Sequence, residues 1–161
     1  MGEGKSEHTK GASGQIELIA RVRQQGKEYR KTAPTKARLL TQKDFDERKG
    51  IIETKEGPVS FQVGDYLAVG VEGEEFPISK ETMGRTKKLE RIVVDEEGLE
   101  WGVYRNTNTV FAMQMKKPFT VQVENGDSIH GKAEDYVVCD GDQCWIVDQK
   151  IFETTYSKVE K

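Results

Sequence analysis

The side chains best placed to do chemistry lie in one short stretch, VGDYLAVGVEGEEFPI, at residues 63–78. Asp65 follows a glycine and precedes Tyr66, and Glu74 lies across a predicted hairpin, close to Phe76. A carboxylate at a Gly-Asp turn usually accepts backbone N–H groups, which is the structural interpretation of Asp65. The alternative is a small-ligand site formed by these four side chains. An acid–base pair at this tip would need one carboxyl group to be desolvated, whereas hairpin tips are normally wet.

The histidines and cysteines do not form a recognisable catalytic or metal-binding set. His8 and His130 lie far apart in the sequence, which contains neither a nucleophile-elbow motif nor a glycine-rich phosphate loop. Cys139 and Cys144 could face each other across a hairpin, where a disulfide would need Cβ atoms about 4 Å apart. Two reduced thiols are the expectation for a cytosolic protein, and the CxxC spacing of metal sites is missing. We therefore predict no catalytic residue, no metal and no cofactor.

The basic stretch KEYRKTAPTKAR, at residues 27–38, is a second candidate for binding. Its side chains Arg30, Lys31, Lys36 and Arg38 could contact a protein partner or phosphate groups. The alternative is an edge strand whose charges keep it solvated and prevent it from pairing with other chains. The sequence leaves both interpretations open.

Composition and charge restrict the classes of function. The 161 residues are 35% apolar and 33% charged, with a net charge of −3, which is not typical of a nucleic-acid-binding domain. Residues 1–49 hold 12 Lys/Arg and 7 Asp/Glu, whereas residues 50–161 hold 13 Lys/Arg and 21 Asp/Glu. The basic N-terminal arm therefore either attracts the acidic body or binds a partner. No apolar run approaches the ~18 residues of a membrane span, and no secretory signal is recognisable. We expect a soluble, cytoplasmic protein.

Short strands separated by turn signals predict a mainly β fold, of the β-rich α+β class, and these strands must position the residues above. Asn125-Gly126 lies between alternating apolar runs and is a strong hairpin signal. Ser79 and Asp148 are predicted to begin short helical turns as N-caps. The stretch TQKDFDERKG, at residues 41–50, is predicted to be a charged connector.

A single longer helix is predicted before the first strands. Ile16, Ile19 and Val22 fall at helical spacing and predict an N-terminal helix over residues 15–28. Alternation of apolar residues in the same stretch also allows a strand. Residues 1–14 have no periodicity and are predicted to be a disordered tail.

An internal repeat with an offset of about 70 residues organises the rest of the chain. Both segments contain a turn, an Asp-Tyr pair, an apolar hairpin and an aromatic residue on its return strand. Corresponding residues are Asp65-Tyr66 and Asp135-Tyr136, Phe76 and Trp145, Met83 and Phe152, and Thr86 and Thr155. We predict two tandem pseudo-repeated small β-barrel or roll units. One unit of about 50–60 residues would be marginally stable, so a single pseudo-symmetric body is favoured over two separate barrels.

Short motifs in both copies match one known pattern. They are Tyr29 and Lys31, Thr54 to Gly57, Gly64-Asp65-Tyr66 and Gly73 to Pro77 in the first copy, and Asp135-Tyr136 and Phe152 to Tyr156 in the second. On these residues the chain resembles the small bacterial and viral domain family named after its PGDYG motif. It departs from the motif at Val63, which replaces a proline, and at Ala133-Glu134, which replace Pro-Gly. The resemblance implies a fold, with no activity attached to it.

These observations predict four segments of the chain and a ranking of three possible functions. The segments are the tail at 1–14, the helix at 15–28, a first PGDYG-like β unit at 29–90, and a second at 91–161 that packs with the first. Because no catalytic set is recognisable, the first hypothesis is a non-enzymatic protein-binding or assembly module whose partner is another protein. The alternative is a small-ligand or nucleotide sensor with its pocket near Glu74 and Phe76. An enzyme of unknown type is the third interpretation.

Overall fold

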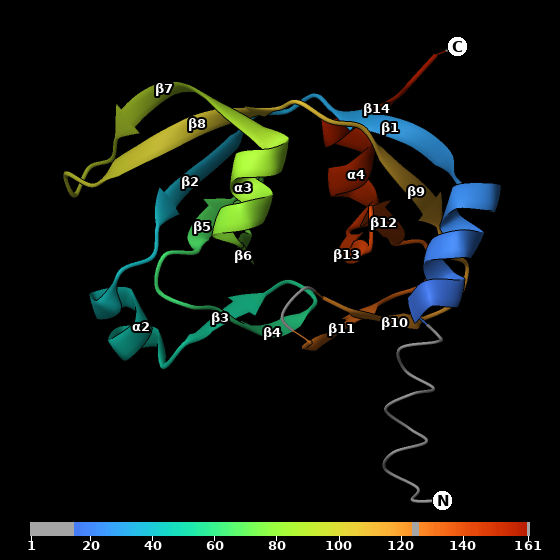
Figure 1. The fold of residues 1–161 in the computed structure, drawn as a ribbon, viewed down its shortest axis with the longest axis horizontal. Coiled ribbons are helices and arrows are strands. Elements are labelled where there is room, and N and C mark those ends of the chain that lie inside the picture. The colour runs from blue at the N-terminus through green and yellow to red at the C-terminus, as the bar shows by residue number, and fades with distance from the viewer. Residues whose placement is uncertain (1–14, 124–125, 161) are drawn as a thin grey trace, which may run out of the picture.

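The fold consists of two five-stranded antiparallel sheets and two hairpins, seen in a computed structural model that describes residues 15–123 and 126–160 (Figure 1). In spatial order the first sheet contains β6 (Glu75–Ile78), β5 (Tyr66–Val69), β2 (Thr35–Leu39), β8 (Glu100–Asn106) and β7 (Lys87–Val94). The second sheet contains β13 (Gln143–Val147), β12 (Tyr136–Asp140), β9 (Val110–Gln114), β1 (Lys27–Lys31) and β14 (Tyr156–Lys158). The predicted mainly β class is confirmed. The tail predicted at 1–14 lies outside the described residues.

Each sheet contains one strand that the chain order would place with the other sheet. β1 precedes β2 in the sequence, but it pairs with β9 and β14 of the second sheet. In the same way β8 precedes β9, but it pairs with β2 and β7 of the first sheet. The boundary predicted between residues 90 and 91 falls inside β7, and each sheet takes one strand from the other side of it. The strand order of the two sheets corresponds position by position, and an origin by duplication stays a prediction.

Two hairpins form the opposite side of the molecule. β3 (Ile51–Thr54) pairs with β4 (Gly57–Ser60), and β10 (Phe119–Gln122) pairs with β11 (Ser128–Gly131). The two hairpins dock against each other, because the backbone N–H of His130 donates to the carbonyl of Glu56 at 3.1 Å and that of Ser60 donates to Asp127 at 2.7 Å. Figure 1 shows these strands along the bottom and β7, β8, β1 and β14 along the top. The hairpin predicted around Asn125-Gly126 is confirmed, and Asn125 itself lies outside the described residues.

The Asp-Tyr turn has the same geometry in both sheets. The backbone N–H of Gln62 donates to Asp65 at 2.9 Å, as the structural interpretation of that carboxylate predicts. At the second turn the N–H of Lys132 donates to Asp135 at 3.0 Å. The residue before each aspartate has a positive φ, which is 98° at a glycine in the first turn and 80° at Glu134 in the second. The left-handed conformation explains why glycine suits this position of the motif.

The helices correct two sequence-based expectations. The charged stretch predicted to be a connector is α2 (Gln42–Arg48), which begins with a capping box between Thr41 and Asp44. The T-x-x-D spacing is the signal that the prediction overlooked. The N-terminal segment is a helix as predicted, but it spans residues 15–25, and the chain continues as β1 from Lys27. Pairing of β1 with the second sheet ends the helix earlier than its apolar spacing suggests.

The two remaining helices begin at the predicted caps. α3 (Lys80–Thr86) begins after Ser79, whose side chain accepts the N–H of Thr82, and α4 (Gln149–Thr155) begins after Asp148. Figure 1 shows both helices between the upper strands and the lower hairpins. Each helix buries one face and exposes the other, with Arg85 of α3 and Lys150 of α4 on the exposed faces. The two helices contribute Met83 and Phe152 to the cores beneath their sheets.

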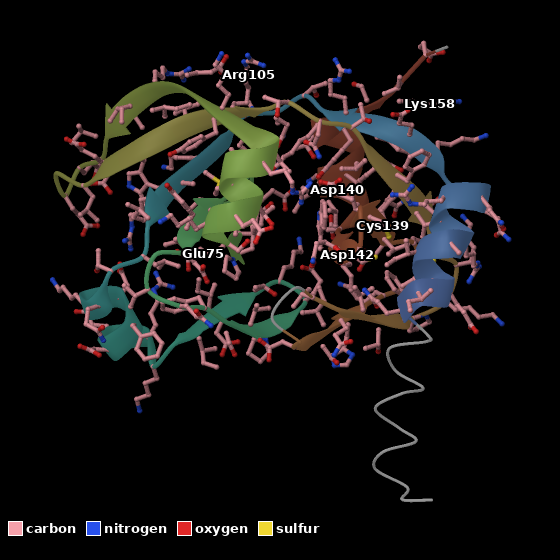
Figure 2. The ribbon with its side chains drawn as sticks, viewed as in Figure 1. Glu75, Arg105, Cys139, Asp140, Asp142 and Lys158 are labelled. Atoms are coloured by element: carbon pink, nitrogen blue, oxygen red, sulfur yellow. The ribbon has the colours of Figure 1, made fainter. Side chains whose placement is uncertain are left out.

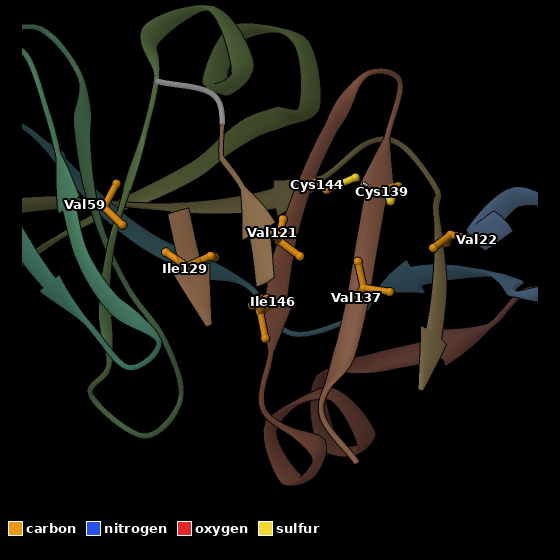
Figure 3. Close-up of a cluster of buried hydrophobic side chains, with 8 residues drawn as sticks. All are labelled: Val22, Val59, Val121, Ile129, Val137, Cys139, Cys144 and Ile146. Carbon is orange, nitrogen blue, oxygen red and sulfur yellow. Dashed lines mark hydrogen bonds between the residues drawn. The ribbon is translucent and has the colours of Figure 1, made fainter. Parts of the chain in front are cut away.

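The largest core lies between the second sheet, the hairpins and the N-terminal helix, and Figure 3 shows its eight buried residues. Val22 of the helix is fully buried there. On the other face of the same sheet, Phe152 stacks on Tyr136 with ring centroids 3.9 Å apart and on Tyr156 at 4.5 Å, and Tyr29 meets it edge-on at 4.8 Å. These rings form an aromatic cluster around the buried Phe152 on that face.

Candidate ligand-binding site

A cavity of about 220 Å³ lies at the centre of the molecule. Residues of β6, β13, α3 and α4 line it, together with residues of the turn between β3 and β4. The lining combines residues of both sheets and of α3 and α4, and the exchanged strands β1 and β8 add Lys31 and Asn106 to it.

Two lysine side chains, one from each sheet, line this cavity. Lys31, at the end of β1, donates from Nζ to Thr35 Oγ1 at 3.1 Å, and Lys87, at the start of β7, donates from Nζ to Asn106 Oδ1 at 2.7 Å. No ion pair among the described residues includes either lysine. Two like charges therefore face one cavity with no carboxylate in direct contact.

The electrostatics of the two ammonium groups follow from this placement. Desolvation lowers the pKa of Lys31 to about 8, although the charge of Glu74 opposes the shift. Desolvation also lowers the pKa of Lys87 to about 8, and the positive charge of Lys31 lowers it further. An anion in the cavity would relieve both effects, because it would solvate the charges and neutralise them.

An unused hydrogen-bond donor lies at the same place. The amide nitrogen Nδ2 of Asn106 is buried and has no hydrogen-bond partner in the described part of the chain. Its orientation is fixed, since the oxygen of the same amide accepts from Lys87. Buried polar groups almost always have a partner, so an isolated donor beside two lysines calls for an explanation. A bound acceptor would supply that partner.

Carboxyl groups line the side of the cavity nearer the hairpins. Burial raises the pKa of Glu56 to about 7, and the negative charge of Asp135 contributes in the same direction. Glu74 accepts the backbone N–H of Glu72 at 2.9 Å. At the rim, Arg85 of α3 pairs with Asp140 at 3.2 Å, and Figure 2 shows Asp140 beside that helix.

The structure divides the ligand-site residues predicted from the sequence into two pairs. Glu74 and Phe76 line the cavity, and the Lys31 ammonium lies 5.7 Å from the centre of the Phe76 ring. Asp65 instead stabilises its own turn. Tyr66 packs edge-on against Tyr104, with ring centroids 6.3 Å apart, and lies outside the cavity lining.

The basic residues predicted as a partner site have separate environments. Lys31 faces the cavity, whereas Arg30 is exposed on the outer surface of β1. Lys36 and Arg38 lie over the ring of Trp101, at 4.9 and 5.3 Å from its centre. Arg38 is also held by Asp44 through two hydrogen bonds of 2.9 and 3.0 Å. This stretch does not form one continuous basic surface.

Three cavity residues were missed in the sequence: Lys87, Asn106 and Glu56. Nothing around them has the spacing of a known motif. One signal was available, because YRKT at residues 29–32 corresponds to YRNT at 104–107. Including these stretches in the repeat would have placed Asn106 at the position equivalent to Lys31.

The two cysteines form a contact next to the cavity. Cys139 and Cys144 are opposite each other on β12 and β13, and their sulfur atoms are 2.6 Å apart as free thiols (Figure 3). The hydrogen bond between them lowers the pKa of Cys139 and raises that of Cys144. Cys144 also lines the cavity, and both thiols are almost fully buried.

Searches for metal sites and membrane spans gave no candidate within the described ranges. There, no group of three or more His, Cys, Asp or Glu side chains is arranged to hold a metal ion. Among the same residues no helix is both long and apolar enough to cross a membrane.

Comparison with known proteins adds no relative. No protein-family model matches the chain, and no curated protein or solved structure is significantly similar to it. The resemblance to the PGDYG-motif family therefore stays a prediction, and the function has to be inferred from the geometry.

Proposed function

We propose that the protein is a non-enzymatic ligand-binding module whose central cavity holds a small anion. The observation that carries this proposal is the convergence of Lys31, Lys87 and the unpartnered amide of Asn106 on one cavity. The proposed anion would accept hydrogen bonds from all three groups. In the cytoplasm, where we expect the protein, such a site would suit a sensor of a small metabolite.

Calorimetric titration with sulfate tests this proposal. Sulfate is a suitable probe because it keeps its charge around neutral pH and accepts several hydrogen bonds. Lys87→Met should weaken binding by roughly 10-fold to 100-fold, since a hydrogen bond to a charged group contributes about 1.5–3 kcal/mol. Lys88→Met is the matched control, because Lys88 is the next residue of β7 and is exposed. Equal loss in both variants, or no binding to the unaltered protein, would contradict the proposal.

A second candidate is the protein-binding module that the sequence suggests. β7 is an edge strand of the first sheet, and Leu89, Ile92 and Val94 on it are 47%, 53% and 63% exposed. An extended segment of a protein partner could pair with this edge and cover the apolar side chains. A complex recovered from native extract should then be lost in the Ile92→Lys variant. A complex that survives this change would exclude the β7 edge as its interface.

A further inference from the structure

The cavity lining carries charges of both signs: Asp140 acts on Lys87 at one end, and Lys55 acts on Glu56 at the other. Lys31 and Lys87 come from strands along the top of the molecule in Figure 1, whereas Glu56 comes from the β3–β4 turn at the bottom. Glu74 also lines the cavity, and its charge acts on both Lys31 and Glu56. The field across the cavity therefore runs from a cationic to an acidic end.

Neither end is neutralised by direct pairing. Glu56 and Glu74 are absent from the ion pairs of the described residues, as are both lysines. Lys55, the nearest basic neighbour of Glu56 in the sequence, is instead within 3.6 Å of Glu72 and 3.5 Å of Asp148. An anion alone would satisfy the lysine end and would leave the acidic end without a partner.

The space between the two ends is apolar and small. Phe76 and Trp145 line it, one from each sheet. The volume of about 220 Å³ lies below the ~300–1,000 Å³ of pockets for drug-sized ligands. A short aliphatic or compact ring body fits these walls, whereas a dinucleotide does not.

We propose that the ligand is a small dipolar molecule, with an acidic group at Lys31, Lys87 and Asn106 and an ammonium group at Glu56 and Glu74. This inference rests on the proposed function for its anionic end and extends it at the other end. The class includes amino acids whose carboxylate and ammonium groups lie at opposite ends of the molecule. It also includes aminoalkyl sulfonates and aminoalkyl phosphates. Their shared chemistry is one anionic and one cationic group joined by a short apolar linker.

Taurine and ethanesulfonate test the inference directly, because they have the same sulfonate and nearly the same length and differ by the ammonium group. At about pH 8, where Glu56 with its pKa of about 7 is ionised, taurine should bind at least 10-fold more tightly. The homologue of taurine with one more carbon extends the comparison to a longer span. Each titration is made by calorimetry on the full chain.

Two variants assign the preference to the acidic end. Glu56→Gln should remove the preference for taurine without weakening the binding of sulfate, because it takes away a negative charge that opposes an anion. Glu53→Gln is the matched control, since Glu53 lies on β3 of the same hairpin and is exposed. Glu74→Gln is a second test, with a reduced preference as the expected result.

The outcomes separate this inference from the proposed function. If sulfate binds but neither taurine nor its longer homologue binds more tightly than ethanesulfonate, the dipolar ligand is refuted and the anion site stands. A preference that is retained in Glu56→Gln also refutes the inference. If sulfate does not bind, both proposals fail together.

Discussion

Raising the pH from about 7 to about 9 should weaken the binding of sulfate about 100-fold. With a pKa of about 8, each of Lys31 and Lys87 is about nine-tenths protonated at the lower pH and about one-tenth protonated at the higher. A ligand that needs both charges binds only the doubly protonated fraction, which falls by about 10-fold for each lysine. A lysine of ordinary pKa would change the affinity by only a few per cent over the same range.

Whether sulfate binding weakens or strengthens as the pH rises depends on all the charged groups that face the two lysines. The charge of Glu74 acts on Lys31, and those of Asp140 and Arg85 act on Lys87. Glu56 titrates in the same range with a pKa of about 7, and its ionisation adds a negative charge that also opposes an anion. Both changes weaken binding as the pH rises, so no compensation is expected.

The assay is calorimetric titration with sulfate at both pH values and constant ionic strength. Lys87→Met should bind more weakly at the lower pH and should keep only about a tenfold dependence on pH, since one titrating lysine remains. Lys88→Met should keep the full dependence. A dissociation constant that is the same at both pH values would refute the assignment of the two lysines as the anion site.

Three further changes test the packing and the turns. Glu134→Gly should raise the free energy of unfolding by about 1 kcal/mol, because Glu134 has a φ of 80° where the matching turn has Gly64, and urea unfolding with no gain would contradict this. Asp44→Ala should lower that free energy by about 3 kcal/mol, because it removes a helix cap and leaves a largely buried arginine unpaired; a loss below about 1 kcal/mol would be inconsistent with such a role. Hydrogen peroxide, which is small enough for a buried site, should join Cys139 and Cys144 in a disulfide while it is reduced to two water molecules. Closing this short loop should stabilise the fold by about 2 kcal/mol, and unchanged free-thiol content after oxidation would exclude the reaction.

Much of the fold was predictable because its signals are local. Ser79 and Asp148 accept backbone N–H groups at the start of their helices, and Asp65 does so in its turn. These interactions depend on residues within three positions of each other, which sequence patterns record well. The capping box of α2 belongs to the same class, and it was missed because the charges of its surroundings suggested a connector.

The candidate site was predictable only in part because it depends on pairing between distant segments. Glu74 and Phe76 were found since they share one hairpin with a recognisable motif. Lys31 and Asn106 line the same cavity as Lys87 because β1 and β8 exchange sheets, and no local pattern records which sheet a strand joins. Only the correspondence of the YRKT and YRNT stretches reflects that arrangement in the sequence.

Anomalous diffraction from crystals of the protein that have been soaked in selenate tests the anion site most directly. Selenium scatters anomalously, so its position is found without assumptions about the density. We expect one strong anomalous peak within hydrogen-bonding distance of Lys31 Nζ, Lys87 Nζ and Asn106 Nδ2. A cavity without a peak, with selenate bound only at exposed lysines such as Lys88, would contradict the proposed function.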